Sequence, residues 1–264
     1  MFTDYFKMTN HPFPAHLPAQ DIQKDARFSE ALDRLRFFVE HETCALITGD
    51  EGVGKSSLIR LFIEMLADKR QPHVYLHLTQ LPTSAFLKLL VNALGEKPAP
   101  TKDAVLMQIT SKLAASDKNT ICIIDEAHLL EAETLVDLRL LLSSAIDASA
   151  RFKLLLVGHS QLKHDIRQSR HTALAQRTTI RYHINPYSMQ QTFDYIDFHL
   201  KRVHASTKLF DEDVKKQIHE QSRGVPRIIN NLATASLITA VSINSQKITA
   251  ECFSHTLADF RIYS

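Results

Sequence analysis

The feature that most constrains this chain is a complete phosphate-binding loop of the pattern G-x-x-x-x-G-K-[ST]. It reads Gly49-Asp50-Glu51-Gly52-Val53-Gly54-Lys55-Ser56 and follows the apolar run Cys44–Ile47. Behind the loop, apolar residues recur at helical spacing from Ser57 to Leu66. A strand before such a loop and a helix after it are the context in which backbone N–H groups surround phosphates. We therefore expect the chain to bind a nucleoside triphosphate.

Each part of the loop has its own expected task. The backbone of residues 49–57 surrounds the phosphates, and Lys55 reaches the β- and γ-phosphates. The hydroxyl of Ser56 is a ligand for Mg²⁺. The sequence thus predicts a triphosphate bound together with a magnesium ion.

A second phosphate-site signature is the apolar run from Ile121 to Ile124, which ends in the adjacent carboxylates of Asp125 and Glu126. We expect Asp125 to hold the hydration shell of Mg²⁺ and Glu126 to polarise the attacking water, because phosphoryl transfer depends on positioning and charge neutralisation. Two such carboxylates alone would also fit a solvated sheet edge. The P-loop upstream favours the functional interpretation.

The same segment continues to His128, and Asp-Glu-Ala-His is also the tetrad that names a helicase superfamily. Those helicases need two tandem nucleotide-binding folds, whereas this chain has one P-loop followed by a helical tail. Helicase activity is therefore not expected. We expect His128 to begin a helix near the site rather than to act as a catalyst.

Further polar residues are candidates for contacts with the γ-phosphate. His159 or Ser160 follows the apolar run that ends at Val157, where one of them would sense the phosphate. Arg227 stands at an expected helix start after Gly224-Val225-Pro226 and is placed to reach back to the γ-phosphate.

Four arginines precede the last expected strand, and one of them would suit an arginine finger that completes the site of a neighbouring subunit. We expect that one to be Arg177. The alternative is that all four are solvated or DNA-facing surface charges. The four are Arg167, Arg170, Arg177 and Arg181.

Periodicity predicts an α/β fold in which nearly continuous apolar strands alternate with helices, which is typical of a parallel sheet covered on both faces. The expected strands are 44–47, 73–78, 120–125, 153–157 and 179–184. After Pro186 only helices are expected, near 189–204, 211–221, 226–242 and 249–260. We therefore divide the chain into a nucleotide-binding domain with an N-terminal linker, 1–186, and a helical lid, 187–264.

Composition limits the classes of protein to which the chain could belong. The net charge of the 264 residues is +2, short of the strongly basic balance that would itself indicate nucleic acid. No apolar run approaches the ~20 residues of a membrane span, and the amino terminus lacks an export leader, so a cytoplasmic protein without membrane contact is expected. The three scattered cysteines predict neither a disulfide framework nor a metal site.

Taken together, the P-loop, Asp125-Glu126-Ala127-His128, Leu156-Val157-Gly158-His159, Ala173–Arg177 and Gly224–Arg227 resemble AAA+ ATPases of the ExeA/GspA-like group. The opening Tyr5-Phe6 and His11-Pro12-Phe13 resemble that group as well. The resemblance covers nearly the whole chain and implies an AAA+ parallel sheet sandwiched by helices, with a C-terminal all-helical lid. It also implies ATP as the nucleotide, ATP hydrolysis to ADP and phosphate, and a homo-oligomer.

On the same resemblance, Asp125 and Glu126 are the Walker B pair and His159 or Ser160 is sensor 1. Arg177 is the trans arginine finger and Arg227 is sensor 2. Sensor 1 is often Asn or Thr in AAA+ proteins, so Gly158-His159-Ser160 departs from the usual pattern and leaves the identity of that contact open.

The group lies close to the transposition ATPases TniB, TnsC, IstB and MuB, and the resemblance leaves two functions open. Secretion ATPases of the ExeA type carry a transmembrane helix and a peptidoglycan-binding module, and this chain stops after the lid with neither. We therefore expect a regulator of DNA transposition that oligomerises with ATP on target duplex DNA, as a ring or filament, and recruits a transposase, with hydrolysis driving disassembly. The alternative is an ATPase of type II secretion assembly that lacks its membrane and periplasmic parts.

Candidate DNA contacts are Lys97, Thr101 and Lys102, which precede the helix that we expect Asp103 to open. In the transposition relatives, this part of the ATPase lines the central channel. A small basic set of this kind would meet the DNA backbone rather than base edges. The plainer interpretation is that the three residues are ordinary surface.

Overall fold

The structure is a computed structural model that describes residues 1–144 and 151–261, and these divide into two compact units. One unit comprises Lys24–Glu51 together with the described part of Lys55–Ile184. The other comprises Met1–Gln23, Gly52–Gly54 and the described residues from Asn185 onward. Each unit has its own buried apolar cluster.

The first unit is built on a five-stranded parallel sheet with the strand order β2-β3-β4-β1-β5. All five expected strands are present, each within a few residues of its predicted ends. Their bounds are β1 Cys44–Gly49, β2 His73–His77, β3 Thr120–Asp125, β4 Phe152–Gly158 and β5 Thr178–Ile184. The expected parallel sheet is therefore confirmed.

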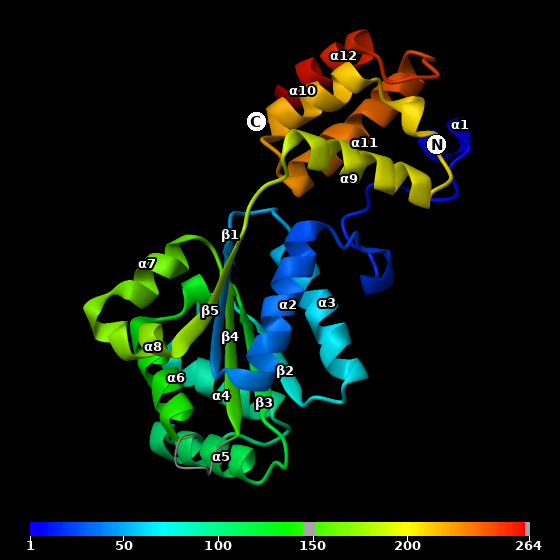
Figure 1. Cartoon of the computed structure of the whole chain (residues 1–264). Coiled ribbons are helices and arrows are strands. Elements are labelled where there is room, and N and C mark those ends of the chain that lie inside the picture. Colours follow the sequence, from blue (N-terminus) through cyan, green and yellow to red (C-terminus); the bar gives the residue numbers. More distant parts are fainter. Residues whose placement is uncertain (145–150, 262–264) are drawn as a thin grey trace. The chain divides into compact units, whose positions relative to one another are not determined.

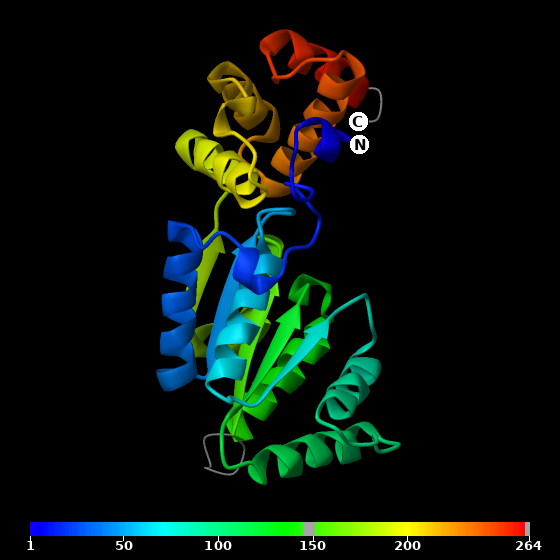
Figure 2. The same ribbon diagram turned by 90° about the vertical axis from the view of Figure 1, so that its right-hand side faces the viewer.

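Helices cover both faces of this sheet (Figures 1 and 2). One face carries α2 and α3, which pack on β1, with α2 also on β5. The other carries α4, α6 and α8, which pack on β2, β4 and β5, respectively, with α5 against α4 and α6. Their bounds are α2 Ala26–His41, α3 Lys55–Asp68, α4 Thr83–Ala93, α5 Lys102–Ala114, α6 Ala132–Ser144, α7 Gln161–Arg167 and α8 Thr172–Arg177.

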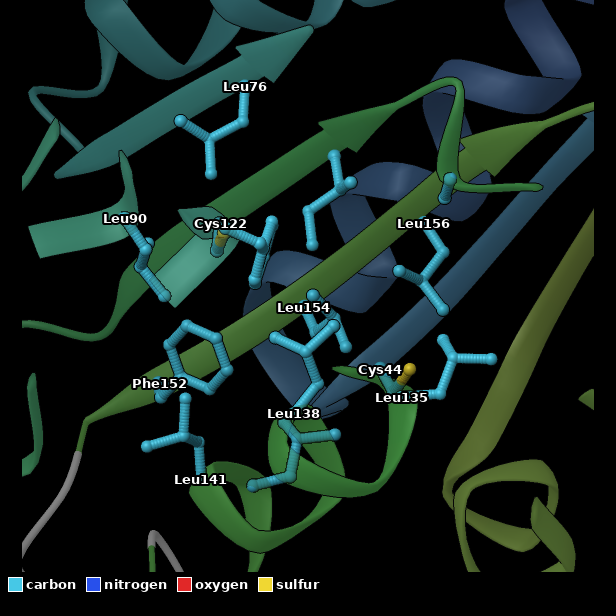
Figure 3. Close-up of a cluster of buried hydrophobic side chains, with 14 of the residues drawn as sticks. Cys44, Leu76, Leu90, Cys122, Leu135, Leu138, Leu141, Phe152, Leu154 and Leu156 are labelled. Carbon is cyan, nitrogen blue, oxygen red and sulfur yellow. The ribbon is translucent and has the colours of Figure 1, made fainter. Parts of the chain in front are cut away.

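The strands alternate their side chains between the two helical layers, as the pleat requires. Figure 3 shows the layer on which Leu154 and Leu156 of β4 lie beside Cys122 of β3 and Cys44 of β1. Helix α6 contributes Leu138 and its apolar neighbours to the same cluster. Burial raises the pKa of the Cys44 and Cys122 thiols to about 12, so both pack here as small apolar groups.

The second unit contains four longer helices, and Ser188 begins the first of them with a capping box. Its hydroxyl accepts the N–H of Gln191, whose side chain accepts the N–H of Ser188. The helices are α9 Met189–Arg202, α10 Glu212–Ser222, α11 Pro226–Ser242 and α12 Ala250–Arg261. The expected helical C-terminal region is thereby confirmed, and no described helix is long and apolar enough to cross a membrane.

The opening segment packs with these helices, which differs from its expected place as a linker of the nucleotide-binding domain. It begins with the short helix α1, Phe2–Tyr5. Phe13 is buried in the helical cluster, and the backbone carbonyl of Pro12 lies 2.7 Å from His199 Nδ1 of α9. The contacts join residues nearly 190 positions apart, which local periodicity cannot predict.

Candidate nucleotide-binding site

The P-loop connects β1 to the N-terminus of α3. β1 ends at Gly49 and α3 begins at Lys55, whose ammonium donates to the carbonyls of Gly49 at 3.0 Å and Asp50 at 3.1 Å. Burial lowers the pKa of Lys55, although the charges of Glu126 and Asp125 oppose that shift. The loop therefore holds a nearly buried cation beside the first turn of a 14-residue helix, which is a favourable place for a phosphate group.

Asp125 ends β3 and is fixed by donors on both carboxylate oxygens. The Tyr75 hydroxyl donates to Oδ2 at 3.0 Å, and the Glu126 N–H donates to Oδ1 at 2.9 Å. His77 Nδ1 lies 3.4 Å from Oδ2. With an exposed fraction of 1%, this carboxylate has little freedom to move, and such outer partners orient a carboxylate for a metal ion.

Glu126 follows in a left-handed backbone conformation, with φ of 56°. For a residue with a side chain this conformation costs about 1 kcal/mol, and such strain gathers at functional sites. Glu126 Oε2 lies 3.3 Å from Nδ1 of His128. His128 itself lies in a single 3₁₀ turn, η2 Ala127–Leu129, rather than at the start of an α-helix.

The residues that follow β4 lie close to the P-loop and to the residues that follow β3. The Ser160 hydroxyl donates to Asp50 Oδ1 of the P-loop at 2.7 Å. The His159 ring packs edge-on against His128, with centroids 5.2 Å apart. Because β4 lies between β1 and β3, the carboxyl ends of the three strands bring these groups to one edge of the sheet. A sensor role for His159 or Ser160 stays a prediction.

The residues at this edge fit a magnesium nucleotide. Ser56 is exposed in the first turn of α3, and a serine hydroxyl and an aspartate are the hard oxygen ligands that Mg²⁺ accepts alongside phosphate oxygens. When bound, the ion would supply charge neutralisation at the phosphates. The residues that would hold it are Ser56 and, through its hydration shell, Asp125.

The four candidate arginines have different surroundings. Arg181 donates to the carbonyls of Thr178 at 2.9 Å and Ala175 at 2.6 Å, so it stabilises the end of α8. Arg177 is the last residue of α8 and is half-buried, whereas Arg167 and Arg170 are exposed. The expected role of Arg177 as a trans finger stays a prediction.

Arg227 is the second residue of α11. Within the second unit, to which the loop tip Gly52–Gly54 belongs, its backbone N–H donates to the Gly52 carbonyl at 3.3 Å. Gly52 has φ of 77°, and an added Cβ there would lie 2.8 Å from that of Arg227. The tip therefore requires glycine, while the role of the Arg227 side chain stays a prediction.

Two of the three candidate DNA contacts have structural tasks that the sequence did not indicate. The Thr101 hydroxyl caps α5 by accepting the Ala104 N–H at 3.4 Å. Lys102 is already the first residue of α5, and its ammonium lies 2.6 Å from Glu133 and 2.8 Å from Asp137 of α6. Lys97 is exposed. Contact with DNA stays a prediction for all three.

Sequence reasoning did not single out Tyr75, His77 or the link between His128 and Glu126. A signal for the first two was present, because Tyr75 and His77 alternate with apolar residues in β2 and so point to one face of the sheet. Their common contact with Asp125 depends on β2 pairing with β3, where His77 lies opposite Asp125. Strand order is not encoded in either segment alone.

Comparison with known proteins gives a match to a domain family over part of the sequence and matches to solved structures in the fold. Residues 39–165 match the family described as AAA domain. Among solved structures, Cdc6p from Pyrobaculum aerophilum matches with a TM-score of 0.74 and 18% identity, covering 94% of this chain and 70% of that one. RuvB of Thermotoga maritima, a Holliday junction branch migration motor, matches with a TM-score of 0.61 and 16% identity, covering 94% and 73%. Part of the chain thus matches an AAA domain, and the two solved structures share its fold.

One curated relative is similar along nearly the whole chain. General secretion pathway protein A of Aeromonas hydrophila is 29% identical over 258 residues, which is 94% of this chain and 46% of the relative. The chain thus spans less than half the length of that relative. A further fold neighbour, the ORC1 protein of Aeropyrum pernix in complex with DNA, has a TM-score of 0.66 at 15% identity, covering 94% of this chain and 67% of that one.

Proposed function

We propose that ATP is hydrolysed at the edge formed by the P-loop, Asp125 and Glu126, and that nucleotide state controls assembly of the chain with copies of itself. Lys55 offsets the charge of the β- and γ-phosphates, and Ser56 and Asp125 hold Mg²⁺. Glu126 takes a proton from the attacking water as the new bond to the γ-phosphorus forms and the bond to the β-phosphate oxygen breaks. ADP and inorganic phosphate are the products. His159 or Ser160, Arg177 from a neighbouring copy, and Arg227 contact the γ-phosphate.

The observation that carries this proposal is the convergence of separate segments on one sheet edge. Ser160 bonds to Asp50 of the P-loop, and Lys55 lies close enough to both Glu126 and Asp125 for their charges to act on its pKa. Phosphoryl transfer needs such groups held in fixed positions around the phosphate. These groups lie at or just after the ends of three buried strands, β1, β3 and β4.

Titration of purified protein with ATP and Mg²⁺ by calorimetry tests the binding part. Lys55→Ala removes the cation beside the phosphates, and we expect binding to be lost. Lys88→Ala, at an exposed lysine of α4, is the matched control and should bind as the wild type does. Unchanged affinity in Lys55→Ala would place the nucleotide elsewhere.

As the biological role, we propose the ATPase part of a secretion-pathway protein that is similar to General secretion pathway protein A. Its support is the 29% identity along 94% of this chain, compared with 15–18% for the fold neighbours described above. In this role ATP binding would drive self-assembly and engagement of a protein partner, and hydrolysis would release it. The chain covers 46% of that relative, so the remaining activities of such a protein lie outside the proposal.

Regulation of DNA transposition is the second candidate, with duplex DNA and a transposase as partners. Its support is the resemblance of the motifs to transposition ATPases and the presence of a DNA-bound ORC1 protein among the fold neighbours. In this role the ATP form would oligomerise on DNA, as a ring or filament, and present it to the transposase. Hydrolysis would disperse the complex.

Binding of arbitrary-sequence duplex DNA at low salt separates the two roles. The hydrolysis-deficient Glu126→Gln protein with ATP, and the wild type with ADP, should be compared by fluorescence anisotropy. The secretion role predicts no DNA binding in either state. Binding in the ATP state alone, weakening steeply with salt as counterions are released, would support transposition instead. Lys97→Ala is the cleaner probe of DNA contact, because Lys102→Ala also breaks ion pairs to α6.

A further inference from the structure

His128 lies between the proposed catalytic carboxylate and the segment after β4. Its Nδ1 is 3.3 Å from Glu126 Oε2, and the backbone N–H of His159 donates to the same nitrogen over 3.4 Å. The side chains of His128 and Glu126 are about three-quarters buried, with exposed fractions of 22% and 28%. One ring nitrogen therefore has two competing partners.

The two contacts require opposite states of that nitrogen. To accept the His159 N–H, Nδ1 must carry a lone pair, whereas a hydrogen bond to the Glu126 carboxylate requires Nδ1 to carry a proton. A single imidazole nitrogen cannot do both at once. Whichever partner is engaged, the other is released.

The backbone around His128 is shaped for this close approach. Gly158 ends β4, and a Cβ added there would lie 3.2 Å from the His128 backbone nitrogen and 3.4 Å from Nδ1. Glu126 on the other side is held at a positive φ of 56°. The His159 ring also packs edge-on against the His128 ring. Both the backbone and the side chain of His159 therefore contact His128.

We propose that His128 is a positioning residue for Glu126, and that it couples the position of the His159 segment to the freedom of the Glu126 carboxylate. While Nδ1 accepts the His159 N–H, the ring leaves the carboxylate free to take a proton from water. When Nδ1 carries a proton, it holds Glu126 in an ion pair and withdraws it from that task. The inference rests on the proposed role of Glu126 and adds the residue that controls it.

The surroundings of His128 favour its neutral form near neutral pH, and in that form the Glu126 carboxylate is free. Burial lowers the pKa of His128, and Lys55 of α3 and His159 after β4 act in the same direction. Glu126 and Asp165 of α7 oppose them. Activity should therefore fall on the acid side as His128 takes up a proton, below the ordinary histidine range.

Steady-state turnover and ATP affinity of His128→Ala and His128→Asn test the proposal. Loss of the ring should lower kcat about 10- to 100-fold, because a misplaced group near the reacting atoms costs rates of this order. The affinity for ATP should change less than about twofold. Asn can accept the His159 N–H but does not titrate, so it should restore most of kcat and shift the acid limb of the pH profile to lower pH. His164→Ala, at an exposed histidine of α7, should leave turnover unchanged.

A double-mutant cycle with Glu126→Gln separates this inference from the function on which it rests. If His128 acts through Glu126, adding His128→Ala to Glu126→Gln should lower the residual rate by less than about twofold. An equal loss on both backgrounds, or an unshifted acid limb in His128→Asn, would overturn the positioning role. Wild-type turnover in Glu126→Gln would instead overturn the role of Glu126 itself. If His128→Ala does not fold, the pH profile of His128→Asn alone decides.

Discussion

At the scale of single residues, Tyr75 is the hydrogen-bond donor that orients Asp125. It lies on β2, and its hydroxyl donates to the nearly buried carboxylate of Asp125 at 3.0 Å. Burial and the Asp125 charge both raise the pKa of the phenol, so it keeps its proton and stays a donor. An aromatic residue on a half-polar strand thus orients the carboxylate that we assign to the Mg²⁺ hydration shell.

Tyr75→Phe should weaken the binding of Mg²⁺, raising the half-saturating Mg²⁺ concentration for ATP turnover about 10- to 100-fold, as loss of an outer partner of a metal site does. A magnesium titration of the ATPase rate measures this. Tyr182→Phe is the matched control, because it also removes a tyrosine hydrogen bond, here to the Arg27 carbonyl. Equal shifts in both variants would mean that Tyr75 acts only on stability.

At the scale of elements, Lys153 connects β4 to the C-terminal end of α2. Its ammonium donates to the carbonyls of Phe38, Val39 and Glu42 at 3.1, 2.7 and 2.7 Å, and the residue is only 5% exposed. The last carbonyls of a helix have no partners within the helix, and a cation there is favourable. The lysine in an otherwise apolar strand therefore satisfies the end of a helix that precedes it by more than 100 residues.

Lys153→Met should lower the free energy of unfolding by about 3 kcal/mol, because the carbonyls at the end of α2 would lose the ammonium as a donor. Urea denaturation of both proteins measures the difference. Lys88→Met, at an exposed lysine, should change it by less than about 0.5 kcal/mol. Similar values for the two variants would exclude the proposed task of Lys153.

In the second unit, we expect the contact between His199 of α9 and Pro12 of the opening segment to depend on pH. Burial lowers the pKa of His199 to about 4, although its hydrogen bond to the Pro12 carbonyl opposes the shift. A lowered pKa in the folded state gives stability that is complete above the unfolded value of about 6.5 and is lost as pH falls towards 4. The whole effect is about 3 kcal/mol.

We expect His199→Asn to flatten the fall in unfolding free energy between pH 6.5 and 4, relative to the wild type. Denaturant midpoints at several pH values measure it. His255→Asn, at an exposed histidine of α12, should keep the wild-type slope. A wild-type slope in His199→Asn as well would assign the acid sensitivity to other groups.

The strands were predictable because β1, β3 and β4 are short, largely apolar runs, while β2 and β5 alternate apolar with polar residues. The P-loop and Asp125-Glu126 were predictable because their motifs are contiguous. Helices α7 and α8 were not predicted, since they are short and rich in polar residues. Strand order and the contacts of Tyr75, His128 and Lys153 depend on segments far apart in the chain. Hydrophobic periodicity indicates which face of a helix or strand is buried, but it does not indicate which other element packs against that face.

At the scale of the whole molecule, the proposed function depends on contact between copies of the chain. Arg177 is the last residue of α8 in the first unit, and Arg227 is the second residue of α11 in the second unit. We assign Arg177 to the site of a neighbouring copy, because an arginine finger acts where subunits adjoin. On this account hydrolysis is a property of the assembly rather than of one chain.

A mixing experiment tests the shared site. Arg177→Ala has an intact P-loop and alone should lose about 10³-fold in kcat. Lys55→Ala has an intact finger but should not bind ATP, so alone it should show no turnover. A mixture should regain measurable turnover, because some interfaces then combine both intact parts. Arg167→Ala, at an exposed arginine of α7, is the control and should retain activity. Absence of any regain in the mixture would contradict a site shared between copies.

The most direct test of the central claim is a paired measurement of ATP affinity and ATP turnover in Glu126→Gln. Removing a group that takes the proton from the attacking water should lower kcat by about 10²- to 10⁴-fold while leaving ATP affinity within about twofold. Glu64→Gln, at an exposed glutamate of α3, should match the wild type in both. Turnover at the wild-type rate in Glu126→Gln would contradict the account, because hydrolysis would then not depend on this carboxylate.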